Sequence, residues 1–113
     1  MGRILVAAAV TASVLAAVST AHAGDPQVDR GIAVYKAQKC NLCHIVAGEG
    51  KKHVLDGVGA KISTEEIREW LVDPKAAAAK AKSTAKPVMK SYAKLPAADI
   101  DALVAYMKTL TKK

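Results

Sequence analysis

The sequence is poor in large aromatic side chains. Its 113 residues include no phenylalanine, one tryptophan and three tyrosines. A chain of this length forms one small domain with a high surface-to-volume ratio. Here it also lacks the large side chains that dominate the energetics of most cores. We therefore expect a bound cofactor to fill part of the interior.

Cysteine is also scarce, because Cys40 and Cys43 are the only two in the chain. Outside the cytoplasm cysteines usually pair into disulfides, but a thioredoxin-like pair belongs in a strand–helix–strand unit. No stretch of the sequence alternates apolar and polar residues as a strand does. A zinc site would need both Cys43 and His44, and adjacent side chains seldom converge on one tetrahedral ion. Both alternatives are therefore disfavoured.

The stretch KCNLCH, residues 39–44, contains C-x-x-C-H, the attachment sequence of c-type haem. Residues i and i+3 of a helical turn face the same side. Cys40 and Cys43 can therefore both form thioethers with the vinyl groups along one haem edge. His44 follows directly, and a neutral imidazole can bind the iron. The motif predicts one covalently bound haem c with its iron.

The first 23 residues are typical of a secretory signal peptide. Arg3 precedes an apolar run over about residues 4–18, and Ala-His-Ala at 21–23 provides a cleavage site with small residues. We expect cleavage after Ala23, which leaves residues 24–113 as a mono-haem domain in the periplasm without membrane insertion. An uncleaved anchor helix is the alternative, because the apolar run is nearly long enough to span a bilayer.

Helical signals begin directly after this segment. Asp25 as N-cap and Pro26 at the first helical position open a helix that reaches about to the haem motif. Gly31 inside it suggests the close approach of another element, because glycine weakens a helix relative to alanine. Residues 45–62 show no periodicity and predict a loop around a haem edge. The apolar positions of the helix are Val28, Ile32 and Tyr35.

A second helix is marked at both ends. Ser63 and Glu66 form a capping box, and the helix stops at Asp73-Pro74. Its buried stripe is expected to comprise Ile67, Trp70 and Leu71. Trp70 is interpreted as core packing, with a hydrogen bond from its indole to a haem propionate as the alternative. Residues 75–88 are rich in alanine and permit a helix that gives way to a loop by Pro87.

The last helix is predicted over about residues 96–109. Its acidic first turns and basic end suit the helix dipole. The apolar stripe repeats at helical spacing and comprises Ile100, Leu103, Val104, Met107 and Leu110.

The residue opposite His44 on the iron decides the function. Met89 lies in an irregular segment after Pro87, where its thioether is free to point at the metal, and it is the preferred sixth ligand. Met107 belongs to the apolar stripe and is expected in the core. His53 is the competitor, but the short segment between it and His44 would have to pass around the macrocycle edge. A site with two firm ligands carries single electrons, whereas a displaceable sixth ligand would indicate a haem sensor or a peroxidase-like enzyme.

Positive charge predominates, with a formal net charge of +7. Such a field attracts anionic partners and speeds their encounter. Nucleic acid is a weaker candidate, because the chain shows no aromatic residues interleaved with the basic ones. The densest basic stretch contains no acidic residue between Lys75 and Lys94, and its lysines are Lys75, Lys80, Lys82, Lys86, Lys90 and Lys94.

These features resemble the class I cytochromes c, specifically the small bacterial periplasmic ones, over essentially residues 24–113. The stretch CNLCH resembles the haem-binding motif of that family, and VMKSYAKLPAADIDALVAYMKTL resembles its C-terminal block. The resemblance implies thioethers at Cys40 and Cys43, proximal ligation by His44 and distal ligation by Met89. It also implies that Gly31 and Tyr35 of the first helix cross Leu103 and Tyr106 of the last.

The resemblance implies an all-α fold, with three to five helices wrapped around one haem, and a one-electron carrier rather than an enzyme. The expected partners are acidic redox proteins (an oxidase, reductase or dehydrogenase) that dock on the Lys75–Lys94 segment, and the carrier is expected to be a monomer. Two positions depart from the family. In KHVLDGVG, His53 stands near the usual proline, whose carbonyl orients the proximal histidine, and Lys90 replaces the proline that commonly follows the methionine.

Overall fold

The computed structural model describes residue 2 and residues 24–112. The predicted signal peptide and its cleavage site lie outside the described residues. Five α-helices, one short 3₁₀ helix and three short strands follow one another in the described part of the chain. In order they are α1 (Pro26–Ala37), η1 (Cys40–Leu42), β1 (His44–Val46), β2 (Glu49–Gly50), β3 (His53–Val54), α2 (Val58–Lys61), α3 (Thr64–Val72), α4 (Pro74–Lys80) and α5 (Ala97–Thr109).

Helix α1 begins where the sequence predicts. The Asp25 side chain accepts a hydrogen bond from Gln27 N at 2.9 Å, and Pro26 occupies the first turn. An acidic N-cap satisfies one of the backbone N–H groups that a helix leaves without a partner. The buried face differs slightly from the predicted stripe, because it is centred on Gly31, Val34 and Tyr35. Gly31 is buried because it lies at a contact with another helix.

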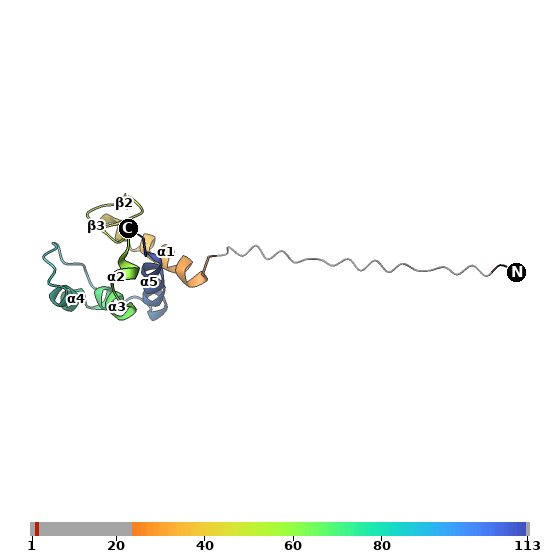
Figure 1. Ribbon diagram of the computed structural model, residues 1–113. Coiled ribbons are helices and arrows are strands. Elements are labelled where there is room, and N and C mark those ends of the chain that lie inside the picture. The colour runs from red at the N-terminus through yellow and green to blue at the C-terminus, as the bar shows by residue number, and fades with distance from the viewer. Residues whose placement is uncertain (1, 3–23, 113) are drawn as a thin grey trace.

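That contact is with α5, the main partner of α1 (Figure 1). A Cβ atom added at Gly31 would collide with the carbonyl oxygen of Ala102 and lie 2.7 Å from Tyr106 Cβ. The predicted close approach at Gly31 is therefore confirmed. The rings of Tyr35 and Tyr106 meet edge to face, with their centroids 5.6 Å apart, a favourable geometry for two aromatic rings.

The strands are the feature that the sequence did not predict. β1 pairs with β2 in antiparallel and with β3 in parallel orientation. Ala47 and Gly48, both with positive φ (51° and 80°), form the tight turn between β1 and β2. Each strand has two or three residues, which is too short for alternation to be visible in a sequence.

Helix α3 has the predicted ends. The Ser63 hydroxyl accepts from Glu66 N at 3.1 Å, and the Glu66 carboxylate accepts from Ser63 N at 3.4 Å. Asp73-Pro74 stops the helix as expected but also starts α4, since the Asp73 carboxylate accepts from Ala76 N at 3.2 Å. Beyond Lys80 the chain is irregular until α5, as predicted. None of the helices within residues 24–112 is long and apolar enough to cross a membrane.

The core is built by four helices and contains no aromatic residue except Tyr35. Its buried hydrophobic side chains are Val34, Tyr35, Ile67, Leu71, Ala77, Ile100, Ala102, Leu103, Val104 and Met107. The prediction that Met107 belongs to the core is confirmed, because its side chain is 7% exposed. Trp70 is only half-buried and is not part of this core, so its interpretation as core packing was wrong.

Candidate functional site

The two cysteines occupy a single tight turn. Cys40 begins η1 and Cys43 follows its end, with Cys43 N donating to the Cys40 carbonyl at 3.1 Å. Lys39, in the left-handed conformation with φ of 55°, turns the chain from α1 into this segment. Both cysteines are free, and Cys40 is half-buried while Cys43 is exposed. The turn thus presents two thiols at the i and i+3 spacing that attachment to one haem edge requires.

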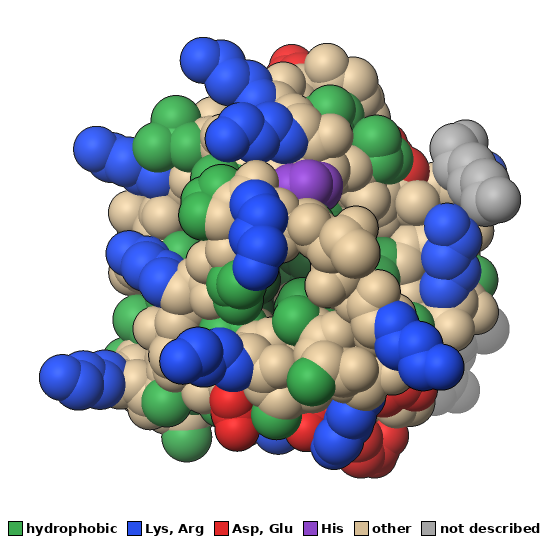
Figure 2. Space-filling model, turned by 90° about the vertical axis from the view of Figure 1, so that its left-hand side faces the viewer, with side chains coloured by type: hydrophobic (Ala, Val, Ile, Leu, Met, Phe, Trp, Pro, Cys, Tyr) green, Lys and Arg blue, Asp and Glu red, His purple; other side chains and the backbone are tan. Residues whose placement is uncertain are grey.

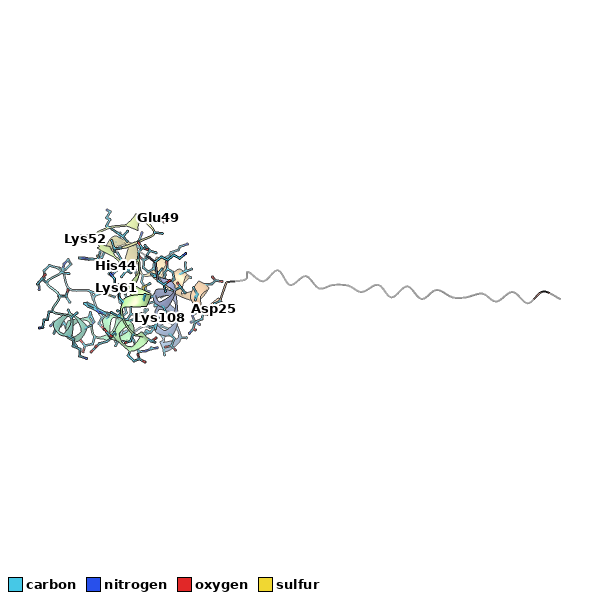
Figure 3. All side chains as sticks on the ribbon, in the orientation of Figure 1. Asp25, His44, Glu49, Lys52, Lys61 and Lys108 are labelled. Carbon is cyan, nitrogen blue, oxygen red and sulfur yellow. The ribbon has the colours of Figure 1, made fainter. Side chains whose placement is uncertain are left out.

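His44 begins β1, on the side of the strands that faces the helices (Figure 3). Burial lowers the pKa of its imidazole, the charge of His53 lowers it further, and the backbone of His53 acts in the opposite direction. The neutral imidazole, which burial favours, is the form that binds a metal. Nδ1 of His44 is buried and has no hydrogen-bond partner within residues 24–112.

His53 lies beside His44, because β1 and β3 pair in parallel with these two residues in register. His53 N donates to the Cys43 carbonyl at 3.0 Å, and the two imidazole centroids are 6.2 Å apart at an interplanar angle of 57°. Paired residues of neighbouring strands project their side chains to the same side. Two axial ligands must approach an iron from opposite sides, so this arrangement disfavours His53 as the partner of His44.

The segment that contains Met89 shares a hydrophobic core with Cys40. Met89 is half-buried and packs against the same hydrophobic core as Cys40. Burial raises the pKa of the Cys40 thiol, and the neighbouring charge of Lys90 lowers it. Burial also raises the pKa of Tyr92, with further contributions from Cys40 and Cys43. Residues 89–92 and the C-x-x-C-H turn are thus close enough for their charges to interact.

The residues present fit a haem. The C-x-x-C-H turn provides two free thiols and a buried imidazole nitrogen without a partner in the described structure, and Met89 provides a half-buried thioether. Figure 2 shows a face on which hydrophobic side chains border a recess, with a histidine beside it. Three large hydrophobic side chains are exposed among the described residues. They are Leu42, Val54 and Val88, with 55%, 62% and 39% of their surface exposed.

Lysines surround this face (Figure 2). All the lysines of the Lys75–Lys94 segment are exposed. Lys80 is engaged, because its Nζ lies 2.6 Å from Glu69 Oε1. Lys90 Nζ lies 5.1 Å from the centroid of the Tyr92 ring, a weakly favourable cation–π contact at an exposed position. The other lysines extend their charges into solvent.

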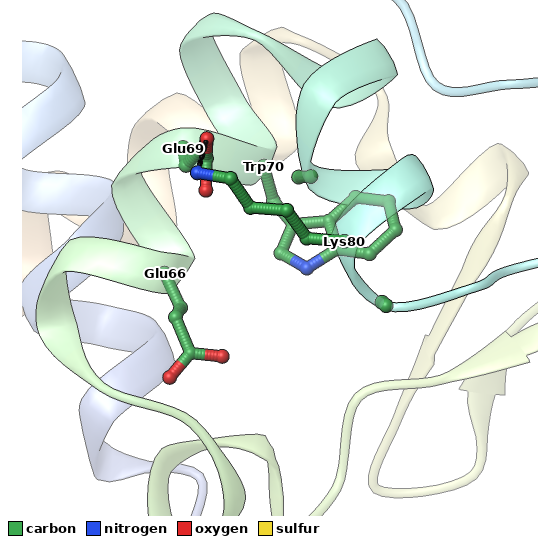
Figure 4. Close-up of a pocket in the computed structure, with 6 residues that line it drawn as sticks. Glu66, Glu69, Trp70 and Lys80 are labelled. Carbon is green, nitrogen blue, oxygen red and sulfur yellow. Dashed lines mark hydrogen bonds and ion pairs between the residues drawn. The ribbon is translucent and has the colours of Figure 1, made fainter.

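Trp70 lines a pocket of its own, together with Glu66, Glu69 and Lys80 (Figure 4). The cation in this pocket is already paired with Glu69. A propionate beside the Trp70 indole would therefore meet carboxylates without a free positive partner. The pocket does not favour the alternative interpretation of Trp70, a hydrogen bond from its indole to a haem propionate.

Two further residues have structural roles that the sequence did not predict. The Asp56 carboxylate accepts from Ala47 N at 2.9 and 3.2 Å, which holds the turn that follows β1 and so fixes the strand that begins with His44. Gly59 allows α2 to touch α5: its N–H donates to the Leu110 carbonyl at 2.9 Å, and an added Cβ would lie 2.7 Å from the Met107 carbonyl oxygen. Neither residue belongs to a periodic pattern, so no signal in the sequence indicated these contacts.

Comparison with known proteins identifies one match. A protein-family model described as Cytochrome c matches residues 28–111. No match was found among curated proteins or among solved structures. The matched region contains the cysteine turn, His44 and Met89, and the family binds haem c covalently, with which the Cys40 and Cys43 pair is consistent.

Proposed function

Because this chain belongs to the cytochrome c family, we propose that it carries single electrons between larger redox proteins, with its iron bound by His44 and Met89. The proposal is supported by the hydrophobic core against which Met89 and Cys40 both pack. A core that both segments share provides a common wall for one flat group between them.

Each residue has a defined task in this proposal. Cys40 and Cys43 hold the haem through thioethers, and His44 contributes Nε2 as the proximal ligand. We assign the His53 carbonyl, in place of the usual proline carbonyl, as the acceptor for His44 Nδ1–H in the haem-bearing protein, because Nδ1 is buried without a hydrogen-bond partner in the described structure. A hydrogen bond to the second ring nitrogen fixes the tautomer and orientation of a ligating histidine.

Met89 completes the set as the distal ligand. The bound haem supplies the one-electron iron couple, and methionine ligation raises its potential relative to two histidines. With a ligand on both faces there is no open position for oxygen or peroxide, and the same ligands suit both oxidation states. This supports a carrier rather than an enzyme.

The visible spectrum of the holoprotein, oxidised and reduced, tests the proposed ligation. We expect a low-spin c-type spectrum with the weak far-red band of sulfur bound to ferric iron. Replacement of Met89 by alanine should abolish that band, whereas replacement of Met107 by leucine should retain it. A wild-type spectrum without the band would exclude Met89 as the ligand.

The proposed partners are acidic redox proteins that dock on the exposed lysines of the Lys75–Lys94 segment. Electrostatic attraction accelerates encounter and is screened by salt over about 10 Å at 0.1 M. With hexacyanoferrate(III) as an anionic oxidant, we expect the oxidation rate of the reduced protein to fall as ionic strength rises. Lys86→Gln should weaken this dependence more than Lys112→Gln, which lies outside the segment. A rate independent of salt would contradict the proposal.

The proposed location is the periplasm, with the protein as a monomer after cleavage behind Ala23. The intact mass of the exported protein distinguishes this from a haem subunit that keeps its N-terminal segment as a membrane anchor. Cleavage removes residues 1–23 and any anchor with them.

One observation favours a second function, a haem sensor or peroxidase-like enzyme with a displaceable ligand. Residues 84–88 are exposed. Among residues 84–90 of the described structure, only one group has a hydrogen-bond partner: Ala85 N, which donates to Ser83 Oγ at 3.3 Å. A segment with so few bonds opens at little cost. Binding of carbon monoxide by the reduced protein at micromolar concentration would support this function over the carrier.

A further inference from the structure

The break between α3 and α4 leaves backbone carbonyls without helical partners. Asp73 N donates to the Glu69 carbonyl at 2.7 Å, but Pro74 has no N–H to continue the series. The last carbonyls of a helix then need partners from elsewhere. In this protein the partners come from the segment that directly follows Met89.

Two bonds join that segment to the end of α3. Tyr92 N donates to the Leu71 carbonyl at 2.7 Å, and Ser91 Oγ donates to the Val72 carbonyl at 2.7 Å. The Ser91 hydroxyl also accepts from Ala93 N at 3.2 Å. It thus connects the irregular segment both to a helix and to its own next turn.

The chain before Met89 has no comparable attachment. Between Ser83 and Ser91 no described residue bonds to a helix. Besides its packing against the hydrophobic core, Met89 is held by the hydrogen bonds of the residues that follow it. Of these two bonds, only the one from Ser91 is made by a side chain and can be removed by substitution.

We propose that Ser91 is a positioning residue for the sixth ligand: its bond to the Val72 carbonyl holds Met89 toward the iron and sets how easily another ligand displaces it. This inference rests on the proposed ligation by Met89. Met89 competes with ligands from solution because the chain holds it near the iron at a high effective concentration. Loss of the bond from Ser91 to the Val72 carbonyl lowers this effective concentration.

The expected effect is moderate, because Ser91 is exposed and the Tyr92 bond remains. One intramolecular hydrogen bond corresponds to about a three- to tenfold change in an equilibrium constant. Ser91→Ala should therefore bind imidazole, a neutral competitor for ferric iron, about three to ten times more tightly than the wild type.

The chain offers a matched control. Ser83 Oγ accepts from Ala85 N, two residues on, as Ser91 Oγ does from Ala93 N, but it donates to no helix carbonyl in the described structure. Ser83→Ala removes the same kind of local hydrogen bond but breaks no side-chain bond to a helix. It should therefore leave imidazole affinity within about twofold of the wild type. Ser91→Thr keeps the hydroxyl and should restore wild-type affinity.

The experiment is a titration of the ferric holoproteins with imidazole, followed by loss of the far-red sulfur band, alongside urea unfolding of each variant. Tighter binding in Ser91→Ala alone supports the inference. Equal affinities in Ser91→Ala and Ser83→Ala overturn it while the proposed ligation stands, and this holds even if Ser91→Ala is less stable to urea. A wild type without the band overturns the ligation and this inference together.

Discussion

At the scale of single residues, Tyr35 is unusual because its phenol lies in the core without a hydrogen-bond partner in the described structure. Burial, with smaller contributions from the charges of Cys40, Tyr106 and Asp56, raises its pKa to about 12. A thioether at Cys40 carries no charge, so burial remains the main cause in the haem-bearing protein. The phenol consequently stays neutral at pH values at which an exposed tyrosine would ionise.

This predicts a specific alkaline loss of stability. Above about pH 10 the phenol ionises in the unfolded chain but not in the folded one, so stability present below pH 10 is lost as pH rises toward 12. Tyr35→Phe should lose less stability than the wild type between pH 8 and pH 11, as measured by urea midpoints of the holoproteins. At pH 8 it should be at least as stable, since it buries no unpaired hydroxyl. Equal losses in both proteins would contradict the assignment to Tyr35.

Gly31 shows what sequence can reveal at this scale, and Gly59 shows what it cannot. Gly31 interrupts a clear helical pattern, and this predicted that another element packs closely against it. That element is α5. Gly59 stands in a stretch without periodicity, where glycine is ordinary. Its contact with α5 arises from tertiary packing of a four-residue helix, for which no local pattern exists.

At the scale of elements, Lys108 joins α5 to α2. Its Nζ donates to the carbonyls of Gly59 and Ile62 at 2.8 and 3.2 Å, and Figure 3 labels it among the helices. A cation at the end of α2 satisfies carbonyls that the short helix leaves free and suits its dipole. The lysine was predicted only as a basic residue near the end of the last helix.

We expect Lys108→Met to destabilise the holoprotein by about 1–3 kcal/mol, because it keeps the length of the stem but leaves two half-buried carbonyls unpaired. Lys61→Met, at an exposed position of α2 itself, should change stability by less than about 0.5 kcal/mol. Urea unfolding of both variants provides the measurement. A similar effect from the two substitutions would mean that the bonds of Lys108 contribute little.

Element boundaries were predictable where caps mark them. The ends of α1, α3 and α5 depend on Asp25-Pro26, on the Ser63 capping box and on acidic first turns. The strands were not predictable, since their formation depends on a turn at Ala47-Gly48 and on the Asp56 carboxylate. The same short strands bring His53 beside His44, so this part of the site required the structure.

At the scale of the whole molecule, the buried hydrophobic side chains belong to α1, α3, α4 and α5. The stretch from Gln38 to Glu66, which includes the cysteine turn and His44, contributes no fully buried apolar side chain. About a quarter of the chain therefore contributes almost no apolar side chains to a core of its own. This agrees with the expectation, drawn from the scarcity of aromatic residues, that a cofactor completes the interior.

The apo-protein should accordingly be largely unfolded. In a variant with Cys40, Cys43 and His44 replaced by alanine, the remaining apolar burial is too small to offset the entropy of ordering the chain. We expect a far-ultraviolet circular dichroism signal well below that of the holoprotein and no cooperative thermal transition. Replacement of Asn41 by alanine, which keeps the attachment residues, is the control and should melt cooperatively. A sharp transition in the triple variant would show that the helices form a core unaided.

The crossing of α1 and α5 also governs the order of events during synthesis. Arg30 and Asp99, which pair across this crossing at 2.8 Å, are 69 residues apart in the sequence. The first helix therefore cannot pair with α5 until α5 has been synthesised. Because the apo-protein is expected to be largely unfolded, we expect the two helices to stay apart until a haem is attached at Cys40 and Cys43. The pairing of the first helix with the last is therefore expected as a late step of maturation that follows haem attachment.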